Sequence, residues 1–173
     1  KLDGARVQVH RRDDEIKVYT RGLNDVTVAV PELVTLVRTF AARELVLDGE
    51  VIALREDGSP LPFQETMRRF GRKLDVETLQ RQLPLSSFFF DCLYVDGQSL
   101  LTASTQERFA ALARAVPGEA RVARIVTTSQ REAEAFLMST LDRGHEGVMA
   151  KALGAPYFAG SRGASWLKLK SSH

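Results

Sequence analysis

The chain lacks the features that mark secreted, disulfide-stabilised and membrane-spanning proteins. Its 173 residues contain one cysteine, Cys92, which excludes an internal disulfide and a zinc site built from several cysteines. No apolar run approaches the roughly 20 residues that cross a bilayer, and no segment has the pattern of a signal peptide. These absences predict a cytoplasmic protein in a reducing compartment.

Common nucleotide- and metal-binding signatures are missing as well. The chain has neither a G-x-x-x-x-G-K-[ST] phosphate loop nor the G-x-G-x-x-G fingerprint of dinucleotide-binding folds. Its three histidines, His10, His145 and His173, lie far apart with no i, i+4 pair, which argues against a structural zinc site. No internal repeat or low-complexity segment is present.

Positive and negative charges nearly balance. The chain has 24 Lys and Arg against 22 Asp and Glu, a formal net charge of +2 and a pI of about 8.9. This balance neither establishes nor excludes a nucleic-acid partner, because a local basic face matters more than the total. With 44% hydrophobic residues, the chain can bury a core and is expected to form one domain over residues 1–173.

The first half of the chain shows both strand and helix patterns. Apolar residues alternate with polar ones over 7–9 and 16–18, and the polar residues between them predict a β-hairpin. The simplest explanation for Arg6, Arg11 and Arg12 is that they form its solvated side. Residues 33–40 have helical spacing behind Pro31. Residues 45–52 predict two short strands, broken by an Asp48-Gly49 turn that would expose carboxylates.

The middle of the chain predicts helices followed by a buried strand. Two short helices are expected between residues 63 and 82, and their basic residues, either solvated or in contact with phosphate, are Arg68, Arg69, Arg72 and Lys73. Residues 87–95 form a nearly continuous apolar run, typical of a central strand. Because side chains alternate along a strand, at least one of its three consecutive phenylalanines could face a pocket.

The last part of the chain predicts two capped helices and further strands. Ser104 with Glu107 and Ser129 with Glu132 are capping boxes that open helices, and residues 121–126 between the helices are expected to be a strand. In the strand predicted at 166–170, Lys168 and Lys170 share one face. Two lysines side by side indicate either an anion between them or an exposed edge strand protected from aggregation.

Six short motifs occur in a fixed order along the chain. They are Lys1-Leu2-Asp3-Gly4-Ala5-Arg6, Thr20-Arg21-Gly22, Asp48-Gly49-Glu50, Phe90-Asp91, Glu146-Gly147-Val148-Met149-Ala150-Lys151 and Trp166-Leu167-Lys168-Leu169-Lys170. In this order they resemble the motifs of ATP-dependent DNA ligases of the bacterial and archaeal replicative-like type, which are covalent nucleotidyltransferases. The mRNA capping enzymes are more distant relatives. The resemblance extends from residue 1 to residue 170.

The resemblance implies a fold and a covalent mechanism. The fold would be α+β, with two mainly antiparallel sheets packed together, flanking helices, and the nucleotide in a groove between the sheets. Lys1 would attack the α-phosphate of ATP, expel pyrophosphate and carry AMP. A lysine attacks as the neutral amine, which nearby cations favour by repelling its protonated form. Lys168, Lys170 and a divalent metal would supply those cations.

The resemblance also assigns roles to other residues. Nucleotide-binding residues would be Arg6 at the ribose, Phe90 stacked on adenine, Arg21 at a phosphate of nucleotide or DNA, Lys151 at phosphate or ribose, Lys168 and Lys170 at the α-phosphate, and Glu50. Glu50 and Glu146 would bind Mg²⁺ or Mn²⁺, and Glu50 could contact the ribose instead. Hard carboxylate oxygens suit these cations.

The expected partner is nicked double-stranded DNA, whose 5′-phosphate would receive AMP before the phosphodiester bond forms in repair, replication or recombination. The resemblance further implies that this is an adenylation domain truncated at its N-terminus. An oligonucleotide-binding-fold (OB-fold) domain would follow it, and larger relatives add an N-terminal DNA-binding domain. We expect a cytoplasmic, nucleoid-associated monomer without a membrane partner. The alternatives are an RNA ligase, a capping-type guanylyltransferase and a non-catalytic nucleotide-binding module.

Overall fold

The computed structural model describes residues 1–70, 75–159 and 165–170. In chain order the elements are β1 (Ala5–Arg12), β2 (Glu15–Thr20), the 3-10 helix η1 (Thr27–Ala29), α1 (Pro31–Arg38), β3 (Glu44–Ala53), α2 (Phe63–Met67), α3 (Val76–Gln82), β4 (Leu85–Val95), β5 (Gln98–Ser99), α4 (Thr105–Ala115), the 3-10 helix η2 (Gly118–Ala120), α5 (Gln130–Asp142), β6 (Gly147–Lys151) and β7 (Trp166–Lys170). No helix among the described residues has the length and apolarity to span a membrane.

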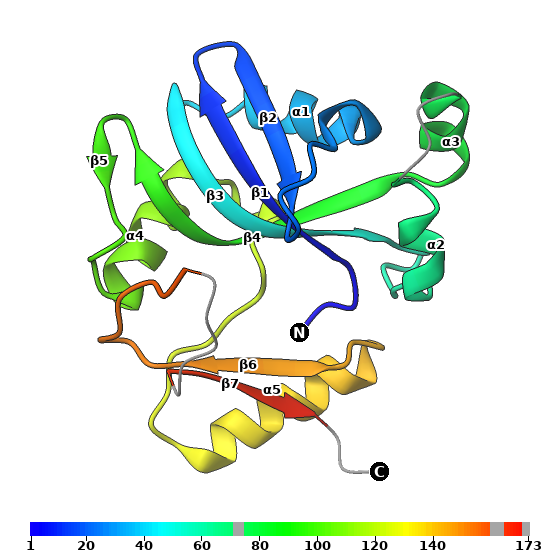
Figure 1. Ribbon diagram of the computed structural model, residues 1–173. Coiled ribbons are helices and arrows are strands. Elements are labelled where there is room, and N and C mark those ends of the chain that lie inside the picture. Colours follow the sequence, from blue (N-terminus) through cyan, green and yellow to red (C-terminus); the bar gives the residue numbers. More distant parts are fainter. Residues whose placement is uncertain (71–74, 160–164, 171–173) are drawn as a thin grey trace.

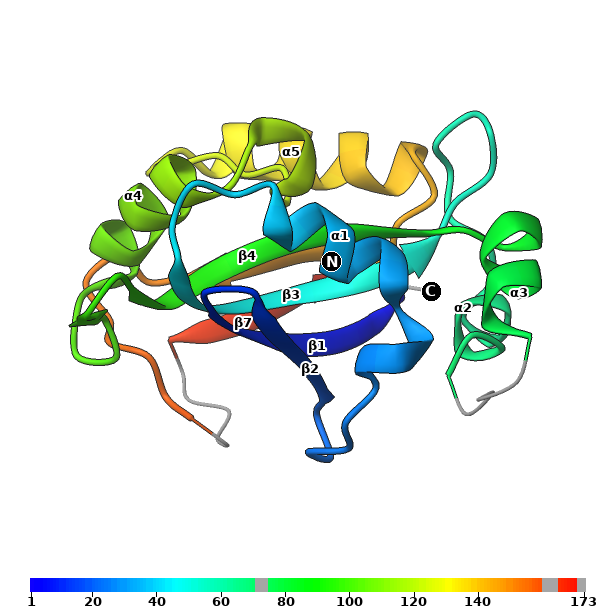
Figure 2. The same ribbon diagram turned by 90° about the horizontal axis from the view of Figure 1, so that it is seen from above.

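Two antiparallel sheets form the framework, which confirms the predicted α+β class. The large sheet has the strand order β2-β1-β3-β4-β5, and the small sheet pairs β6 with β7. The small sheet lies below the large one in Figure 1, and Figure 2 shows it beneath the large sheet from above. Helix α5 packs against β6, and α4 packs against β4. The chain therefore forms two layers joined by the segment between η2 and α5.

The predicted hairpin is confirmed. β1 pairs with β2 in a register that places Val9 opposite Val18. The alternation seen in the sequence becomes alternating burial, because the side chains at positions 7, 9, 16 and 18 are at most 5% exposed. They join the core beneath α1, where Leu33 and Val37 are also buried. Helix α1 begins at Pro31, as its sequence predicts.

The prediction of two short strands around Asp48-Gly49 is wrong. Residues 44–53 form one strand, β3, with an irregular register at Asp48/Gly49 in its pairing with β4. β3 lies inside the large sheet and is hydrogen-bonded to β1 on one side and β4 on the other. These two ladders satisfy the backbone groups that a turn would expose. Asp48 and Gly49 therefore continue the strand. Asp48 is consequently only 1% exposed.

Gly49 is explained by close packing between β3 and β4. A Cβ atom at position 49 would lie 2.7 Å from Cδ1 of Phe89 and 3.0 Å from the carbonyl oxygen of Phe88. Phe89 is fully buried and packs edge-on against Phe40, with the ring centroids 6.0 Å apart. The ring therefore has little room to move away from an added methyl group.

Both helices predicted from the capping-box pattern begin where expected, and each serine caps its helix. The hydroxyl of Ser104 accepts a hydrogen bond from the backbone N–H of Glu107 at 3.2 Å, where α4 begins. The hydroxyl of Ser129 accepts one from the N–H of Glu132 at 3.2 Å, where α5 begins. Each serine thus satisfies one of the free N–H groups of a helix end.

The prediction of a strand at residues 121–126 is wrong. Within the described residues, this segment makes only one bridge to a strand, between Arg121 and Phe89. Strand β5 pairs with the last two residues of β4, which leaves the edge of β4 at Phe89 open for this short contact. The chain then leaves the large sheet and crosses to α5 (Figure 1). A segment that crosses between layers cannot continue the ladder, despite its β-forming residues.

Two arginines expected at the surface are buried instead. Arg11 is 5% exposed and donates hydrogen bonds to the carbonyl oxygens of Val37, Phe40 and Ala42, near the end of α1. Arg69 is 1% exposed and forms two hydrogen bonds with the carboxylate of Glu32, at 2.7 and 2.8 Å. Both arginines therefore hold the fold together.

The rest of the predicted basic face supplies little evidence for phosphate binding. Arg68 is exposed and pairs with Glu65 at 2.8 Å within its own turn. Arg72 and Lys73 lie outside the described residues. The basic face therefore loses Arg69 to the core, and only Arg68 is seen at the surface.

We expect Gly49→Ala to destabilise the protein by about 1 to 3 kcal/mol, because the new methyl group overpacks against Phe89. Chemical denaturation followed by circular dichroism would measure the change. Gly154→Ala is a matched control, since a Cβ there would meet no atom within 4 Å. Equal stability of the two variants would contradict this explanation of Gly49.

Candidate functional site

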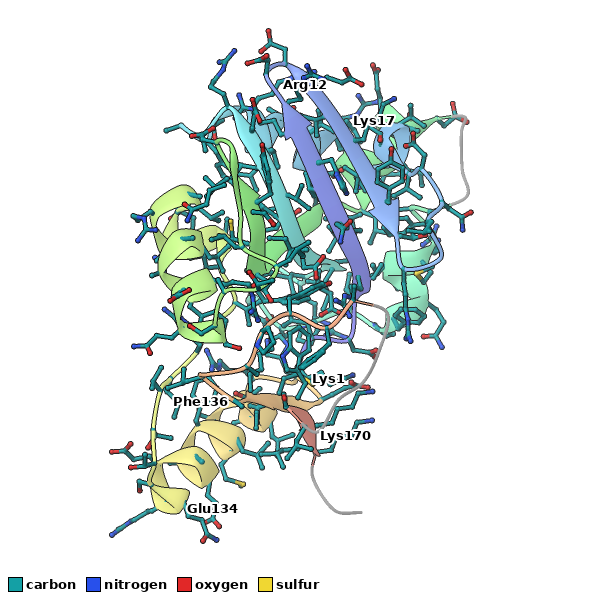
Figure 3. All side chains as sticks on the ribbon, turned by 60° about the vertical axis from the view of Figure 1, so that its left-hand side comes forward. Lys1, Arg12, Lys17, Glu134, Phe136 and Lys170 are labelled. Atoms are coloured by element: carbon teal, nitrogen blue, oxygen red, sulfur yellow. The ribbon has the colours of Figure 1, made fainter. Side chains whose placement is uncertain are left out.

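Lys1 lies between the two sheets, where its amine meets a carboxylate from the far end of the chain. Its Nζ forms an ion pair and a hydrogen bond with Glu146, directly before β6. In Figure 3 Lys1 lies between the large sheet and the end of β7, where Lys170 is labelled. The structure thus brings the motif that begins at Lys1 close to the motifs that contain Glu146 and Lys170.

Gly4 allows the segment that carries Lys1 to lie directly against β3. A Cβ atom at position 4 would come within 2.3 Å of the carbonyl oxygen of Val51. Any larger residue would push the segment away from β3 and displace Lys1 with it. The glycine in the first motif is therefore required by space rather than by a turn.

The two lysines of β7 reach the same place. Register in the small sheet sets Lys170 opposite Gly147 and Lys168 opposite Met149. The hydrogen bond from Lys1, followed by the charges of Lys1, Lys170 and Lys168, lowers the pKa of Glu146. Lys1 thus bonds to Glu146, and Lys168 and Lys170 lie close enough for their charges to act on the same carboxylate.

Glu50 adds a second carboxylate from the large sheet. It is partly buried on β3, and burial raises its pKa from 4.5 to about 7. The charge of Lys1 and the backbone N–H of Gly4 oppose this rise. Glu50 is therefore near the lysine amine and changes charge close to neutral pH.

A second cluster joins the sheets through aromatic rings. Of the three consecutive phenylalanines, Phe89 faces the core and Phe90 faces the small sheet, where its ring centroid is 6.4 Å from that of Trp166. The Nζ of Lys151 lies 4.5 Å from the centroid of Phe90 and 4.0 Å from that of Trp166. These are cation–π distances. Burial lowers the pKa of Lys151 to about 8.

Arg6 reaches this aromatic cluster, although its side chain is still 42% exposed. Its guanidinium carbon lies 5.5 Å from the centroid of Phe90 and 6.0 Å from that of Trp166. Its Nη2 donates to Oδ2 of Asp48 at 3.0 Å. Arg6, Phe90 and Lys151, which are separated by up to 145 positions, therefore meet between the sheets.

Two residues of this cluster, Asp48 and Tyr157, were missed as site residues by the sequence. The carboxylate of Asp48 accepts hydrogen bonds from Arg6, from Gln8 at 3.1 Å and from the Tyr157 hydroxyl at 2.6 Å. Asp48 had a signal, because it precedes Glu50 by two residues and so shares a strand face with it. Tyr157 follows no periodic pattern, and its partner is 109 residues away.

Arg21 is the one predicted site residue that lies apart from these contacts. It is exposed in the turn after β2, and it forms no ion pair within the described part of the chain. Its assigned contact with a phosphate stays a prediction.

A family model and several curated proteins indicate the same family. A family model described as "ATP dependent DNA ligase domain" matches residues 1–170. A probable DNA ligase of Anaeromyxobacter dehalogenans (strain 2CP-C) is 61% identical over all 173 residues, which cover 34% of that protein. A probable DNA ligase of Mycobacterium marinum is 54% identical, again over the whole chain and 34% of the relative. The chain spans about a third of the length of these curated relatives.

Solved structures are similar as well. The ligase domain from M. tuberculosis LigD has a TM-score of 0.74 at 28% identity, over 98% of this chain and 52% of that one. A mycobacterial DNA ligase D complexed with ATP and MES has a TM-score of 0.73 at 28% identity, with the same coverage.

The raised pKa of Glu50 predicts a pH-dependent stability. Between pH 4.5 and about 7 the folded state binds a proton at Glu50 that the unfolded state has lost, so this group's contribution falls as pH rises through that interval. The free energy of unfolding should fall by on the order of 2 kcal/mol across this interval, allowing for the partial solvent exposure of Glu50. We expect Glu50→Gln to remove this fall. Denaturation across this pH range would measure it.

Glu56→Gln is the control for the same change at an exposed carboxylate. If stability follows the same pH profile in both variants, Glu50 is not the group responsible.

Proposed function

This chain belongs to the family of ATP-dependent DNA ligases, and on that basis we propose that it is the adenylation domain of such an enzyme and carries AMP on Lys1. The observation that supports this most directly is the ion pair between Lys1 and Glu146, with the charges of the two lysines of β7 acting on the same carboxylate. A nucleophile, an acidic group and two phosphate-binding cations are the parts that nucleotidyl transfer requires.

In the proposed reaction, the Nζ of Lys1 attacks the α-phosphorus of ATP. A P–N bond forms, the bond to the bridging oxygen of pyrophosphate breaks, and lysyl-AMP results. AMP then passes to the 5′-phosphate at a DNA nick, and attack by the 3′-hydroxyl releases AMP and closes the phosphodiester bond. Before the first step Lys1 must leave its ion pair with Glu146 and lose a proton.

The two lysines of β7 favour the transfer itself. Lys168 and Lys170 would stabilise the negative charge that develops on the transferring phosphate. The α-phosphate would replace Glu146 as the anion between the lysines. This is the role proposed for the paired lysines of β7, in preference to protection of an edge strand.

The aromatic cluster is proposed to bind the nucleoside. Phe90 would stack on adenine and Arg6 would contact the ribose side, since Arg6 already lies against the Phe90 ring. The ammonium of Lys151 now covers that ring at 4.5 Å, so a stacked base requires it to swing away. A phosphate or ribose oxygen would be its new partner. Arg21 is assigned to a phosphate of the nucleotide or of DNA.

Glu50 and Glu146 are the proposed ligands of Mg²⁺ or Mn²⁺. The described residues contain no group of three or more His, Cys, Asp and Glu that could enclose an ion. Two carboxylates fit a cation that keeps water and takes its other ligands from phosphates, as Mg²⁺ commonly does. A bound cation would neutralise phosphate charge. Glu50, whose pKa is raised to about 7, must first give up its proton.

The proposed partners follow from the family and from the length of the relatives. We propose nicked double-stranded DNA as the substrate, with an OB-fold domain and a DNA-binding domain supplied by the same enzyme. The domain would act as a monomer in the cytoplasm, in association with the nucleoid. The greater length of the relatives supports the additional domains.

Intact-mass measurement after incubation with ATP and Mg²⁺ tests the central proposal. We expect a gain of one adenylyl group, removed by pyrophosphate and absent in Lys1→Ala. The measurement should include the full-length protein, in which the family's other domains would be present. Absence of the adduct there would refute the assignment of Lys1, as would an undiminished adduct in Lys1→Ala.

Nucleotide competition separates the DNA ligase from the alternative enzymes. ATP should form the adduct and an equal concentration of GTP should not compete, whereas a capping-type guanylyltransferase would form it from GTP. Transfer of AMP to nicked DNA but not to RNA ends excludes an RNA ligase. A non-catalytic module would bind nucleotide without forming any adduct.

A further inference from the structure

Tyr157 lies outside all six motifs, in the segment between β6 and β7, yet it occupies the centre of the contacts between the two sheets. Its hydroxyl donates to Oδ2 of Asp48 at 2.6 Å. The same oxygen accepts the hydrogen bond from Nη2 of Arg6, and this Nη2 lies 3.4 Å from the Tyr157 hydroxyl. Arg6, Asp48 and Tyr157 therefore form a closed triangle of polar contacts.

The ring of Tyr157 is held on two sides. It packs edge-on against Trp166, with centroids 6.2 Å apart. The guanidinium carbon of Arg108 lies 5.7 Å from its centroid. Arg108 is itself immobilised, because it is fully buried and its Nε donates to Asp91 at 2.8 Å. The hydroxyl is thus aimed at Asp48 by packing, and little entropy remains to be lost when its bond forms.

Asp48 in turn determines the position of Arg6. Gln8 fixes Oδ1 of the carboxylate, and Tyr157 shares Oδ2 with Arg6. Arg6 is bound through Nη2 alone, and its Nε and Nη1 make no hydrogen bond to any residue that the structure describes. Arg6 therefore keeps two donors, Nε and Nη1, for a ligand beside the ring of Phe90.

We propose that Tyr157 is a positioning residue for the nucleotide, acting through Asp48 on Arg6. The proposal rests on the function proposed above for Arg6 and Phe90. Without the hydroxyl, the buried charge of Asp48 has only Arg6 and Gln8 to satisfy it, and the carboxylate is free to turn. Arg6 is then drawn toward Asp48 and no longer holds its Nε and Nη1 donors toward the ribose.

The single tryptophan of the chain makes this testable, because Trp166 touches Tyr157, Phe90 and Lys151. ATP is titrated into the 173-residue chain without divalent metal, and the fluorescence of Trp166 gives the dissociation constant. Tyr157→Phe keeps the ring and removes the hydroxyl. We expect it to weaken ATP binding about 10-fold, as for a lost hydrogen bond to a charged group.

Tyr94→Phe is the matched control. The Tyr94 hydroxyl also donates to a carboxylate, that of Glu44 at 3.2 Å, but Glu44 is at the opposite end of β3 from Glu50. We expect this variant to bind ATP within about 2-fold of the wild type. Unfolding temperatures of both variants separate a loss of stability from a loss of positioning.

A double-mutant cycle tests the route through Arg6. In an Arg6→Ala background, or Arg6→Gln if the first does not fold, Tyr157→Phe should cause almost no further loss of affinity. An equal loss in both backgrounds overturns the proposal, as does a Tyr157→Phe variant that binds ATP as tightly as Tyr94→Phe. If the wild-type chain itself binds no ATP, the nucleotide site proposed for Arg6 and Phe90 is wrong for this chain, and the role of Tyr157 fails with it.

Discussion

The buried carboxylate of Asp48 is the constraint on which the relation between the two sheets depends. An ionised carboxylate in a protein interior is strongly destabilising unless donors surround it. Asp48 lies on β3, inside the large sheet, and β1 supplies two of its donors, Arg6 and Gln8. The third donor, Tyr157, belongs to the segment between the strands of the small sheet. Satisfying this one charge therefore draws the small sheet against the large one.

A balance of charge governs the other half of the site. The charges of Lys1, Lys168 and Lys170 act on Glu146, and Glu50 lies near Lys1 on β3 with a pKa of about 7. Before a nucleotide arrives, the carboxylates compensate the lysines. A triphosphate with its metal brings both kinds of charge, so the same side chains can exchange partners without leaving a buried ion unpaired. The ion pair between Lys1 and Glu146 thus describes a resting arrangement compatible with the proposed chemistry.

Local structure followed the sequence wherever neighbours along the chain decide it. The hairpin, the start of α1 and the serine caps of α4 and α5 depend on residues a few positions apart, and all are confirmed. Predictions failed where contacts with distant parts of the chain decide the structure. Asp48-Gly49 has the composition of a turn, but ladders to β1 and β4 make it a strand. Arg11 and Arg69 look like solvated residues, yet the carbonyls after α1 and the carboxylate of Glu32 draw them inside.

The sequence by itself determined the α+β class, the family and the set of residues that carry the proposed chemistry, because each motif is a short and local pattern. Only the tertiary structure decided which of these residues meet. Lys1 reaches Glu146 across 145 positions, and Tyr157 reaches Asp48 across 109. Such contacts depend on strand register and on the closing of two sheets around a buried charge. Periodicity along the chain encodes neither, so the role of Tyr157 could be inferred only once the sheets were in place.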